Sequence, residues 1–430
     1  MLRPDTPRLL LLLPTATYRT AAFVEAARRL GVELTVASER PSTFQDANPR
    51  GLLTLHLSDP ARAAGEARAF AQEHPLQGVV GVDDDTAVVA AAIAGDLGLV
   101  GNDVAAAQAA RDKHEQRTLL AAAGVPVPRF TRYGVDEDPR LLAAGVSYPC
   151  VLKPLRLAAS RGVIRADTPE AFVAVFERVK RILKDAGCET RDAGGVEGDA
   201  SRYLLVEDFV PGGEYALEGL LVAGELRVLA LFDKPDPLDG PYFEETIYVT
   251  PSRLPADQQR AVAACAERAA AALGLREGPV HAELRVNASG PWVIELAARP
   301  IGGRCSGALR FGTGDSGLGT GASLEEIIVR HALGMPIPSF EREPTASGVM
   351  MIPVPTGGGV LREVRGVEAA RALPQVEEVV ITAHPGQELV PWPEGARYPG
   401  FIFARGETPD AVEAALRAAH QRLQFVVAAD

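Results

Sequence analysis

The chain has 430 residues, a formal net charge of -12 at pH 7 and four cysteines with no Cys-x-x-Cys pair. A hydrophobic fraction of 47% and a charged fraction of 23% exclude a disordered chain, a collagen and a coiled coil. The acidic balance argues against a nucleic-acid surface, and the scattered cysteines exclude a disulfide scaffold and favour a reducing compartment. At roughly 100–200 residues per domain, two to four domains are expected.

The apolar run nearest the N-terminus covers residues 9–13 and is closed by Pro14. A secretory signal needs about 7–15 apolar residues and a membrane span about 20, so we predict a buried first strand here. Nothing else in the sequence reaches spanning length. We therefore expect a cytoplasmic protein with neither a membrane nor a nucleic-acid partner.

Strands and helices alternate through the first hundred residues. A helical pattern follows the first strand and ends at Gly31, which suits a helix C-cap. Alternating β and α segments predict a doubly wound parallel sheet, in an N-terminal α/β domain over residues 1–103. The expected strands lie at 8–14, 32–38, 52–57 and 78–84, and the expected helices at 17–30, between the last two strands, and at 87–98.

Three aspartates, Asp83, Asp84 and Asp85, stand at the end of the last of these strands. Ligands of parallel sheets bind at the carboxyl ends of the strands, so this turn is a candidate ligand contact. The alternative is a solvated or helix-capping acidic turn.

Two proline-rich stretches divide the rest of the chain. The first follows a helix expected over 104–123 and ends it at Gly124, and the second covers residues 335–344. The predicted segments are a linker helix (104–128), a small α+β segment (129–201) with one helix at 168–186 and a Gly- and Asp-rich loop at 187–201, a strand-rich segment (202–338) with helices at 256–273 and 323–333, and a C-terminal α+β domain (339–430).

Two nucleotide motifs are excluded. The G-x-G-x-x-G of Gly312, Gly314 and Gly317 follows no predicted strand and has no acidic residue about 20 positions on, so it fails as a dinucleotide loop. The sequence also has no G-x-x-x-x-G-K-[ST], which excludes a P-loop NTPase.

The strongest physical signal is a predicted hairpin formed by VHAELRVN and PWVIELAAR. A three-residue hairpin loop commonly ends on a left-handed residue, which suits Gly290. A one-residue slip stays open, because Pro291 cannot donate to the ladder. The expected register pairs Glu283 with Glu295, Arg285 with Val293, and Asn287 with Pro291.

The pairing of Glu283 with Glu295 would place two carboxylates side by side. Like charges directly opposite are unfavourable, and a hard divalent cation bound to oxygens removes the repulsion. Both glutamates are therefore candidate metal ligands, and the alternative is two exposed glutamates on a solvated face. The same face carries His281, Arg285, Ala297 and Arg299.

A second signal lies in residues 149–167, where two strands bracket a loop of small residues. Small residues let the backbone approach a ligand closely, and backbone N–H groups beside cations make an anion-binding concavity. The alternative is an ordinary basic hairpin. The loop contains Ala158, Ala159, Ser160 and Gly162, and the cations are Lys153, Arg156 and Arg161.

A third signal is the pair Glu207 and Glu214, which flank Pro-Gly-Gly between two strands. Taken singly, each resembles a surface glutamate, just as Lys113 on the linker helix resembles a surface lysine. The segment 231–248 carries Lys234 and Asp239 and is a candidate substrate cover, with a plain surface loop as the alternative.

Together and in this order, these segments resemble the ATP-grasp superfamily over most of the chain. RDKHEQRTLLAAAGVPVPRF resembles its linker, VLKP and AASRG its lysine strand and phosphate loop, VEDFVPGGE its adenine and ribose hinge, and HAELRVN with GPWVIELAARPIGG its metal and substrate strands. The second metal strand and the segment from Gly348 resemble those of L-amino acid ligases. Ala297 replaces an asparagine common elsewhere in the superfamily, which removes one metal ligand. The resemblance implies an ATP-grasp fold, with 129–201 as the lid and 202–338 as the central, metal-binding domain.

The resemblance also implies a role for each matching residue. Lys113, Lys153 and Ser160 would contact the ATP phosphates, Glu207 the adenine amine, main-chain groups near Phe209 and Val210 the ring edge, and Glu214 the ribose. Glu283 and Glu295 would carry Mg²⁺ or Mn²⁺, Arg299 and Lys153 would be catalytic, and Arg299, Arg304 and Lys234 are candidate substrate contacts.

The activity implied is that of an ATP-dependent carboxylate–amine ligase acting through an acyl phosphate. It would join two L-amino acids into a dipeptide and release ADP and phosphate, and homodimers are common in the resembling families. Such phosphoryl transfer needs positioning and charge neutralisation rather than a nucleophilic residue, and the sequence has no motif that demands one. The alternatives are a carboxylase-type enzyme, which would need bicarbonate or biotin, and a regulator that binds ATP without turnover.

Overall fold

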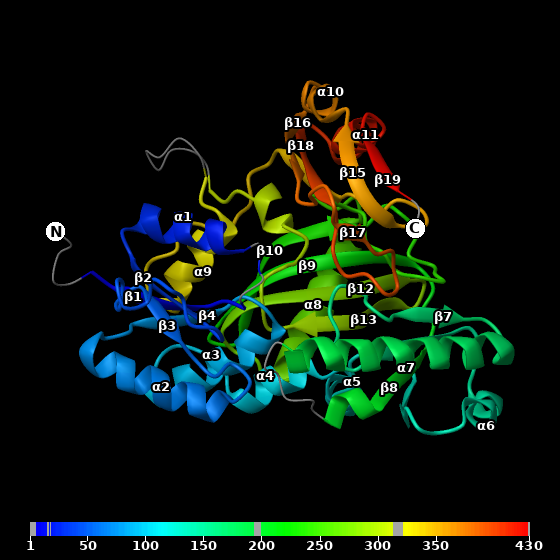
Figure 1. The fold of residues 1–430 in the computed structure, drawn as a ribbon, viewed down its shortest axis with the longest axis horizontal. Helices are drawn as coiled ribbons and strands as arrows, with labels where there is room; N and C mark the ends of the chain where they lie inside the picture. Colours follow the sequence, from blue (N-terminus) through cyan, green and yellow to red (C-terminus); the bar gives the residue numbers. More distant parts are fainter. Residues whose placement is uncertain (1–5, 15–16, 18, 193–198, 313–320, 429–430) are drawn as a thin grey trace.

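The computed structural model describes residues 6–14, 17, 19–192, 199–312 and 321–428, without the side chains of 188–192 and 199. Within these ranges the strands form four sheets (Figure 1). No helix in the described ranges is both long and apolar enough to cross a membrane. Gly312 is described, in the left-handed region, whereas Gly314 and Gly317 of the rejected dinucleotide motif lie outside these ranges.

The N-terminal sheet is parallel and has helices on both faces, which confirms the doubly wound prediction. Leu9 lies in the core beneath α1, and Leu10 lies in the core with α2 and α3, because successive side chains of a strand alternate. The helix α9, from far along the chain, packs beside α1. The sheet order is β3-β2-β1-β4, with β1 (Arg8–Leu12), β2 (Glu33–Ser38), β3 (Leu52–Thr54), β4 (Gly78–Gly81), α1 (Thr20–Leu30), α2 (Pro60–Glu73), α3 (Asp84–Leu97) and α9 (Leu324–Ala332).

The single linker helix expected over 104–123 is wrong, because the structure has two helices there, α4 (Val104–Arg111) and α5 (Lys113–Ala122). The break is at Asp112, whose backbone is extended and whose side chain accepts from the amides of His114 and Glu115. An aspartate at this N-cap position satisfies amides that a new helix leaves unpaired. Lys113 is therefore the first residue of α5.

The lid sheet is antiparallel, with the order β5-β8-β6-β7, and α7 covers it. Because β8 pairs with both β5 and β6, it lies in the lid sheet and not in the central domain, beyond the expected boundary at 201. The long helix also continues past its expected end at 186 into the expected loop. The bounds are β5 (Phe130–Gly134), α6 (Pro139–Leu142), β6 (Cys150–Pro154), β7 (Ile164–Ala166), α7 (Pro169–Asp192) and β8 (Tyr203–Asp208).

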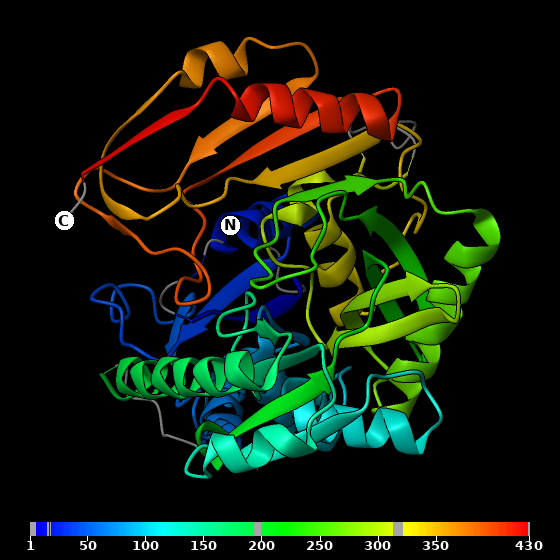
Figure 2. The ribbon, with the colours of Figure 1, turned by 90° about the vertical axis from the view of Figure 1, so that its right-hand side faces the viewer.

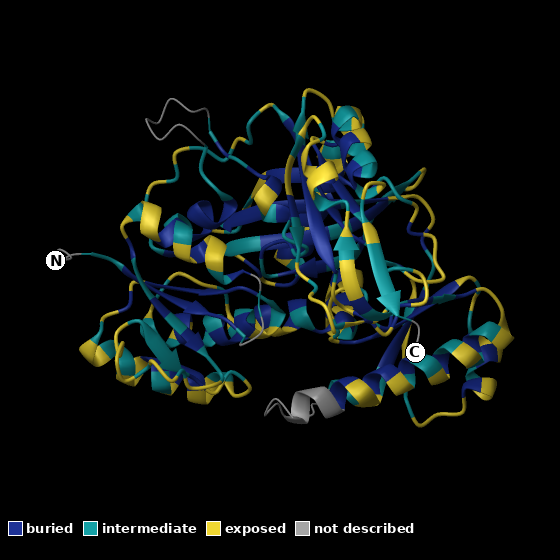
Figure 3. Ribbon diagram, turned by 45° about the horizontal axis from the view of Figure 1, so that its top comes forward, coloured by how far each residue is buried: buried dark blue, intermediate teal, exposed yellow. Residues whose placement is uncertain are grey.

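The central and C-terminal regions share one eight-stranded sheet, of order β13-β12-β9-β10-β11-β14-β18-β16. The expected boundary at 338 therefore does not divide this sheet, although β15, β17 and β19 form a small sheet of their own (Figure 2). Strands of the large sheet are mostly buried, while α7 alternates buried and exposed residues (Figure 3). The bounds are β9 (Gly213–Val222), β10 (Glu225–Asp233), β11 (Ile247–Thr250), α8 (Ala256–Ala272), β12 (Gly278–Asn287), β13 (Gly290–Ala297), β14 (Ala346–Met351), β15 (Gly359–Arg365), α10 (Val367–Arg371), β16 (Val376–Ile381), β17 (Glu388–Leu389), β18 (Gly400–Gly406), α11 (Pro409–His420) and β19 (Gln424–Ala428).

Candidate active site

The β12–β13 hairpin pairs Glu283 with Glu295 as predicted, but through a different register. Asn287 pairs with Gly290 rather than with Pro291, so the turn is one residue tighter than expected. Arg285 accordingly pairs with Trp292 rather than with Val293. The ladder then shifts by one residue next to Glu283, where Ile294 is the extra residue, and this bulge restores the glutamate pair.

The bulge at Ile294 also sets which side chains enter the core. Val293 is fully buried with Leu284 in the cluster beneath α8, whereas Glu295 is partly exposed. In a regular strand, side chains two residues apart lie on one face, so without the bulge Glu295 would point into the core beside Val293. The carbonyl oxygen of Ile294 accepts from the buried guanidinium of Arg117.

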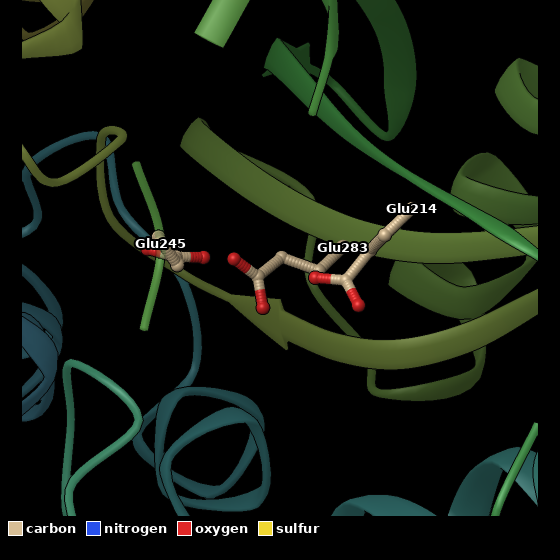
Figure 4. Close-up of side chains that lie close together, drawn as sticks. All are labelled: Glu214, Glu245 and Glu283. Carbon is tan, nitrogen blue, oxygen red and sulfur yellow. The ribbon is translucent and has the colours of Figure 1, made fainter. Parts of the chain in front are cut away.

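Lys234 contacts three carboxylates that come from separate segments. Figure 4 shows the three glutamates, Glu214, Glu245 and Glu283. The ammonium of Lys234 is 2.8 Å from Glu214, 2.5 Å from Glu245 and 2.8 Å from Glu283. One oxygen of each glutamate lies within 4.8 Å of the others. Lys234 was a candidate substrate contact and Glu214 a ribose ligand, while Glu245 was not singled out. We call these four residues the acidic cluster.

The charges of the acidic cluster depend on one another. Burial disfavours the ammonium of Lys234, but the three carboxylates outweigh this and raise its pKa. Burial would also raise the pKa of Glu283, yet Lys234 and His281 hold it well below its ordinary value. The pKa of Glu245 is raised to about 7, chiefly by burial. Repulsion from Glu283 also raises this pKa, whereas the ammonium of Lys234 lowers it. Glu283 therefore stays ionised at neutral pH, whereas Glu245 takes up a proton near neutral pH.

His281 lies on the same face as Glu283, as expected, and stands between two carboxylates. Its Nδ1 is 3.5 Å from Glu218 and its Nε2 is 3.6 Å from Glu283. Burial lowers the pKa of His281, but the two carboxylates together raise it above the ordinary value. The imidazole beside Glu283 therefore takes up a proton more readily than an ordinary histidine.

A second group joins the linker to the end of β13 and to the N-terminal sheet. The Nζ of Lys113 is 3.1 Å from the carbonyl oxygen of Leu157 and 3.3 Å from Glu295. Arg299 contacts Asp84 at 3.0 Å. Burial would raise the pKa of Asp84, but Arg299 and Lys113 hold it below its ordinary value.

The three carboxylates of the turn Asp83–Asp85 have three different partners. Asp83 caps α3 by accepting from the amide of Thr86, as the helix-capping alternative supposed. Asp84 meets Arg299, and Asp85 pairs with Arg111. Arg299 was expected to meet the substrate, and its contact with this turn was not anticipated.

A third group surrounds Glu207, which is almost fully buried. Its two carboxylate oxygens accept from Arg117 at 2.5 Å and from Lys153 at 2.6 Å. Burial alone would raise the pKa of Glu207, but these two cations lower it. Sequence reasoning missed Arg117, although it stands four residues after Lys113 and so on the same face of α5.

The hinge between β8 and β9 contains Phe209 and Val210. The ring of Phe209 lies between the guanidinium groups of Arg165, 4.3 Å away, and Arg285, 4.8 Å away. The amide of Phe209 donates to the carbonyl oxygen of Pro149, so this N–H is not free to read a base. The main chain of the buried Val210 remains the candidate for the ring-edge contact.

The loop between β6 and β7 is the predicted phosphate loop, and its turn contains two consecutive left-handed residues. Ala159 and Ser160 are left-handed, with φ values of 55° and 54°. Arg156 contacts Asp112 at 3.2 Å, which ties the loop to the cap of α5. Arg304, a candidate substrate contact, instead places its guanidinium over two aromatic rings of β18, those of Phe401 and Phe403.

The donor set fits a magnesium nucleotide. Glu283 and Glu295 present two carboxylates from neighbouring strands, and oxygen ligands of this kind suit hard divalent ions. Lys113 and Lys153 supply positive charge from the linker and the lid, as phosphate binding requires.

Three family matches follow the chain in order. Residues 24–101 match the ATP-grasp N-terminal domain, residues 146–308 the ATP-grasp domain, and residues 351–428 the L-amino acid ligase C-terminal domain 2. The chain is therefore an ATP-grasp protein. Its C-terminal domain gives it the particular domain set of the L-amino acid ligases, as the sequence resemblance implied.

Known proteins agree with this assignment. The chain is 32% identical to alanine–anticapsin ligase of Bacillus subtilis over 213 residues, which is 48% of this chain and 44% of that protein. It is 28% identical to human carnosine synthase 1 over 64% of this chain and 34% of that protein. These matches thus span less than half of each relative. The fold matches an L-amino acid ligase structure from Bacillus licheniformis with a TM-score of 0.75, at 24% identity and 99% coverage of both chains.

Proposed function

We propose that the protein is an ATP-dependent carboxylate–amine ligase that joins two amino acids and releases ADP and phosphate. The observation that carries this proposal is the carboxylate pair, Glu283 and Glu295, with the buried Lys113 of the linker in contact with Glu295. The relatives named alanine–anticapsin ligase and carnosine synthase, together with the C-terminal domain match, support amino acids as the substrates.

The nucleotide would lie between the lid and the central domain. Lys113, Lys153 and the loop around Ser160 would bind its phosphates, Glu214 its ribose and the main chain at Val210 its base. Glu207 fixes Lys153 and Arg117 in place, and its contact with the adenine amine stays a prediction. Magnesium held by Glu283 and Glu295 would neutralise charge on the transferred phosphoryl group.

A carboxylate is a poor electrophile, so it must be activated before an amine can attack it. One carboxylate oxygen would attack the γ-phosphorus, the bond to ADP would break, and an acyl phosphate would form. The amine would then attack the acyl carbon, lose a proton and displace phosphate. Arg299 would hold the carboxylate by a planar, two-pronged contact and stay charged throughout, while Asp84 orients it from behind.

The test is phosphate release with ATP and Mg²⁺, scored against all pairs of amino acids, with the product identified by mass. We expect release to depend on an amino acid pair and to yield the dipeptide mass. Release that needs bicarbonate or biotin instead would replace this proposal with a carboxylase. ATP binding without release in any mixture would indicate a regulator.

A further inference from the structure

The segment 390–399, which joins β17 to β18, reaches out of the C-terminal domain and contacts the phosphate loop. We call it the strap. The indole Nε1 of Trp392 donates to the carbonyl oxygen of Ala159 at 2.8 Å. The amide of Gly162 donates in return to the carbonyl oxygen of Pro393 at 2.9 Å. Two hydrogen bonds of opposite direction thus join the strap to both sides of the turn.

The strap has a second attachment on the lid. Glu394 accepts from Arg178 of α7 through both oxygens, at 2.6 Å and 2.9 Å. The same guanidinium donates to the hydroxyl of Tyr242, in the segment that precedes the acidic cluster's Glu245. In Figure 2 the strap, coloured orange-red, descends from the C-terminal strands towards α7.

The turn that the strap holds is unfavourable by itself. Ala159 and Ser160 are consecutive left-handed residues that carry side chains, and such residues favour the right-handed region. Backbone of this kind persists only where its surroundings hold it, and it gathers at ligand-binding sites. Trp392 supplies such a hold, because its hydrogen bond ends on the carbonyl of the first left-handed residue.

The other end of the strap lies beside the acidic cluster. Trp392 is buried and stacks on Tyr398, with ring centroids 4.7 Å apart and planes inclined by 31°. Burial raises the pKa of Tyr398, and the nearby charges of Glu245 and Glu244 raise it further. One short segment of the C-terminal domain therefore contacts the phosphate loop and carries a tyrosine that is influenced by the charge of Glu245.

We propose that Trp392 is a positioning residue that holds the phosphate loop closed over the nucleotide from the C-terminal domain. The inference rests on the proposed function for the identity of that nucleotide. It assigns the C-terminal domain a part in nucleotide binding, because the lid is fastened at its loop by Trp392 and at its helix by Glu394.

The first test measures loop opening without reference to turnover. The loop contains two trypsin sites, after Arg156 and after Arg161. Trp392→Phe keeps a stacked ring and removes only the N–H donor. Loss of one hydrogen bond should raise the open population, and so cleavage at these two sites, about fivefold. Cleavage is read by mass in the full-length protein, with and without ATP and Mg²⁺.

Matched variants distinguish the loss of the strap's contacts from a general loosening of the protein. Trp292→Phe removes the other indole donor of the chain, which contacts the side chain of Asn287 and not the loop. Glu394→Gln weakens the attachment to α7, and Glu363→Gln alters an exposed ion pair of the same domain. We expect faster loop cleavage in Trp392→Phe and Glu394→Gln alone. Unchanged loop cleavage in both, with circular dichroism of the folded protein, would overturn the proposal.

The second test uses the reaction. Trp392→Phe should raise the KM for ATP about fivefold and leave the KM for the amino acids unchanged. An unchanged KM for ATP would count against the positioning role. If no amino acid pair supports turnover, the proposed function fails, while ATP protection of the trypsin sites still decides whether the strap holds the loop.

Discussion

Three carboxylates of the proposed site each have a basic partner beside them. Glu207 lies between Arg117 and Lys153, Glu283 meets Lys234, and Glu295 meets Lys113. Removing one member of a buried pair leaves a charge without compensation, which destabilises a protein by about 3–5 kcal/mol. Substitutions at Glu207 or Lys234 will therefore change stability as well as chemistry, whereas Glu295 is more exposed and better suited to a test.

Glu295→Ala should abolish phosphate release while leaving the fold intact. The variant loses one metal ligand, but Lys113 keeps its contact with the carbonyl oxygen of Leu157. The measurement is phosphate release beside circular dichroism, with Glu225→Ala, in an exposed ion pair of the same sheet, as the control. Full activity in this variant, or of the unmodified protein in chelator, would refute the metal assignment.

Arg299→Lys should keep ATP affinity and lose most ligation. A lysine can still pair with Asp84, but it has no planar fork for a carboxylate. Nucleotide binding is measured by calorimetry beside amino-acid-dependent phosphate release. Loss of ATP binding, or normal ligation, would show that Arg299 does not act on the carboxyl substrate.

Two local irregularities of regular elements bring charges into the site. The break at Asp112 makes Lys113 the first residue of α5, and the bulge at Ile294 turns Glu295 away from the core. Contacts with other segments hold both irregularities in place. Asp112 accepts from Arg156 of the phosphate loop, and the carbonyl oxygen of Ile294 accepts from Arg117.

Asp112→Ala should therefore weaken ATP binding beyond its effect on stability. The loss of an N-cap costs about 1 kcal/mol in unfolding free energy. Thr408→Ala removes the equivalent cap of α11, where Thr408 accepts from the amide of Ala411, far from the site in the sequence. Urea unfolding should show similar losses, but only Asp112→Ala should raise the KM for ATP. Equal KM values in the two variants would contradict this.

Sequence reasoning found the elements that carry the site more readily than their irregularities. Hydrophobic periodicity predicted both strands of the hairpin, but a bulge leaves no mark in that pattern, so the Glu283–Glu295 pair was reached through an incorrect register. Glu245 could not be found in this way, because it stands in an irregular segment and joins Lys234 only through folding. Arg117 did carry a signal, its spacing of four from Lys113.

At the scale of the whole molecule, the titration of the acidic cluster should appear in the stability of the protein. Glu245 has a folded pKa of about 7 against an ordinary value of 4.5. Between these values the folded state binds more protons, so the unfolding free energy falls as pH rises, by about 3 kcal/mol. The lowered pKa of Glu283 gives the opposite slope, but only below this window.

Glu245→Gln should flatten this dependence, because the amide does not titrate. Urea unfolding in metal-free buffer at pH 5 and pH 7 gives the two free energies for each protein. The unmodified protein should be less stable at pH 7 than at pH 5, and the variant should show a smaller difference. The same difference in both would mean that Glu245 ionises near its ordinary pKa.

The eight-stranded sheet has a consequence for any shortened form of the chain. β11 pairs with β14 through Ile247, Tyr248, Val249 and Thr250, all of them buried. A chain ending at residue 345 would lose β14 and leave β11 as an open edge with unpaired amides and carbonyls. Such edges recruit other strands. The truncated protein should self-associate, and light scattering against the full-length chain would detect this. The C-terminal domain thus covers an edge of the sheet that would otherwise be open to other strands.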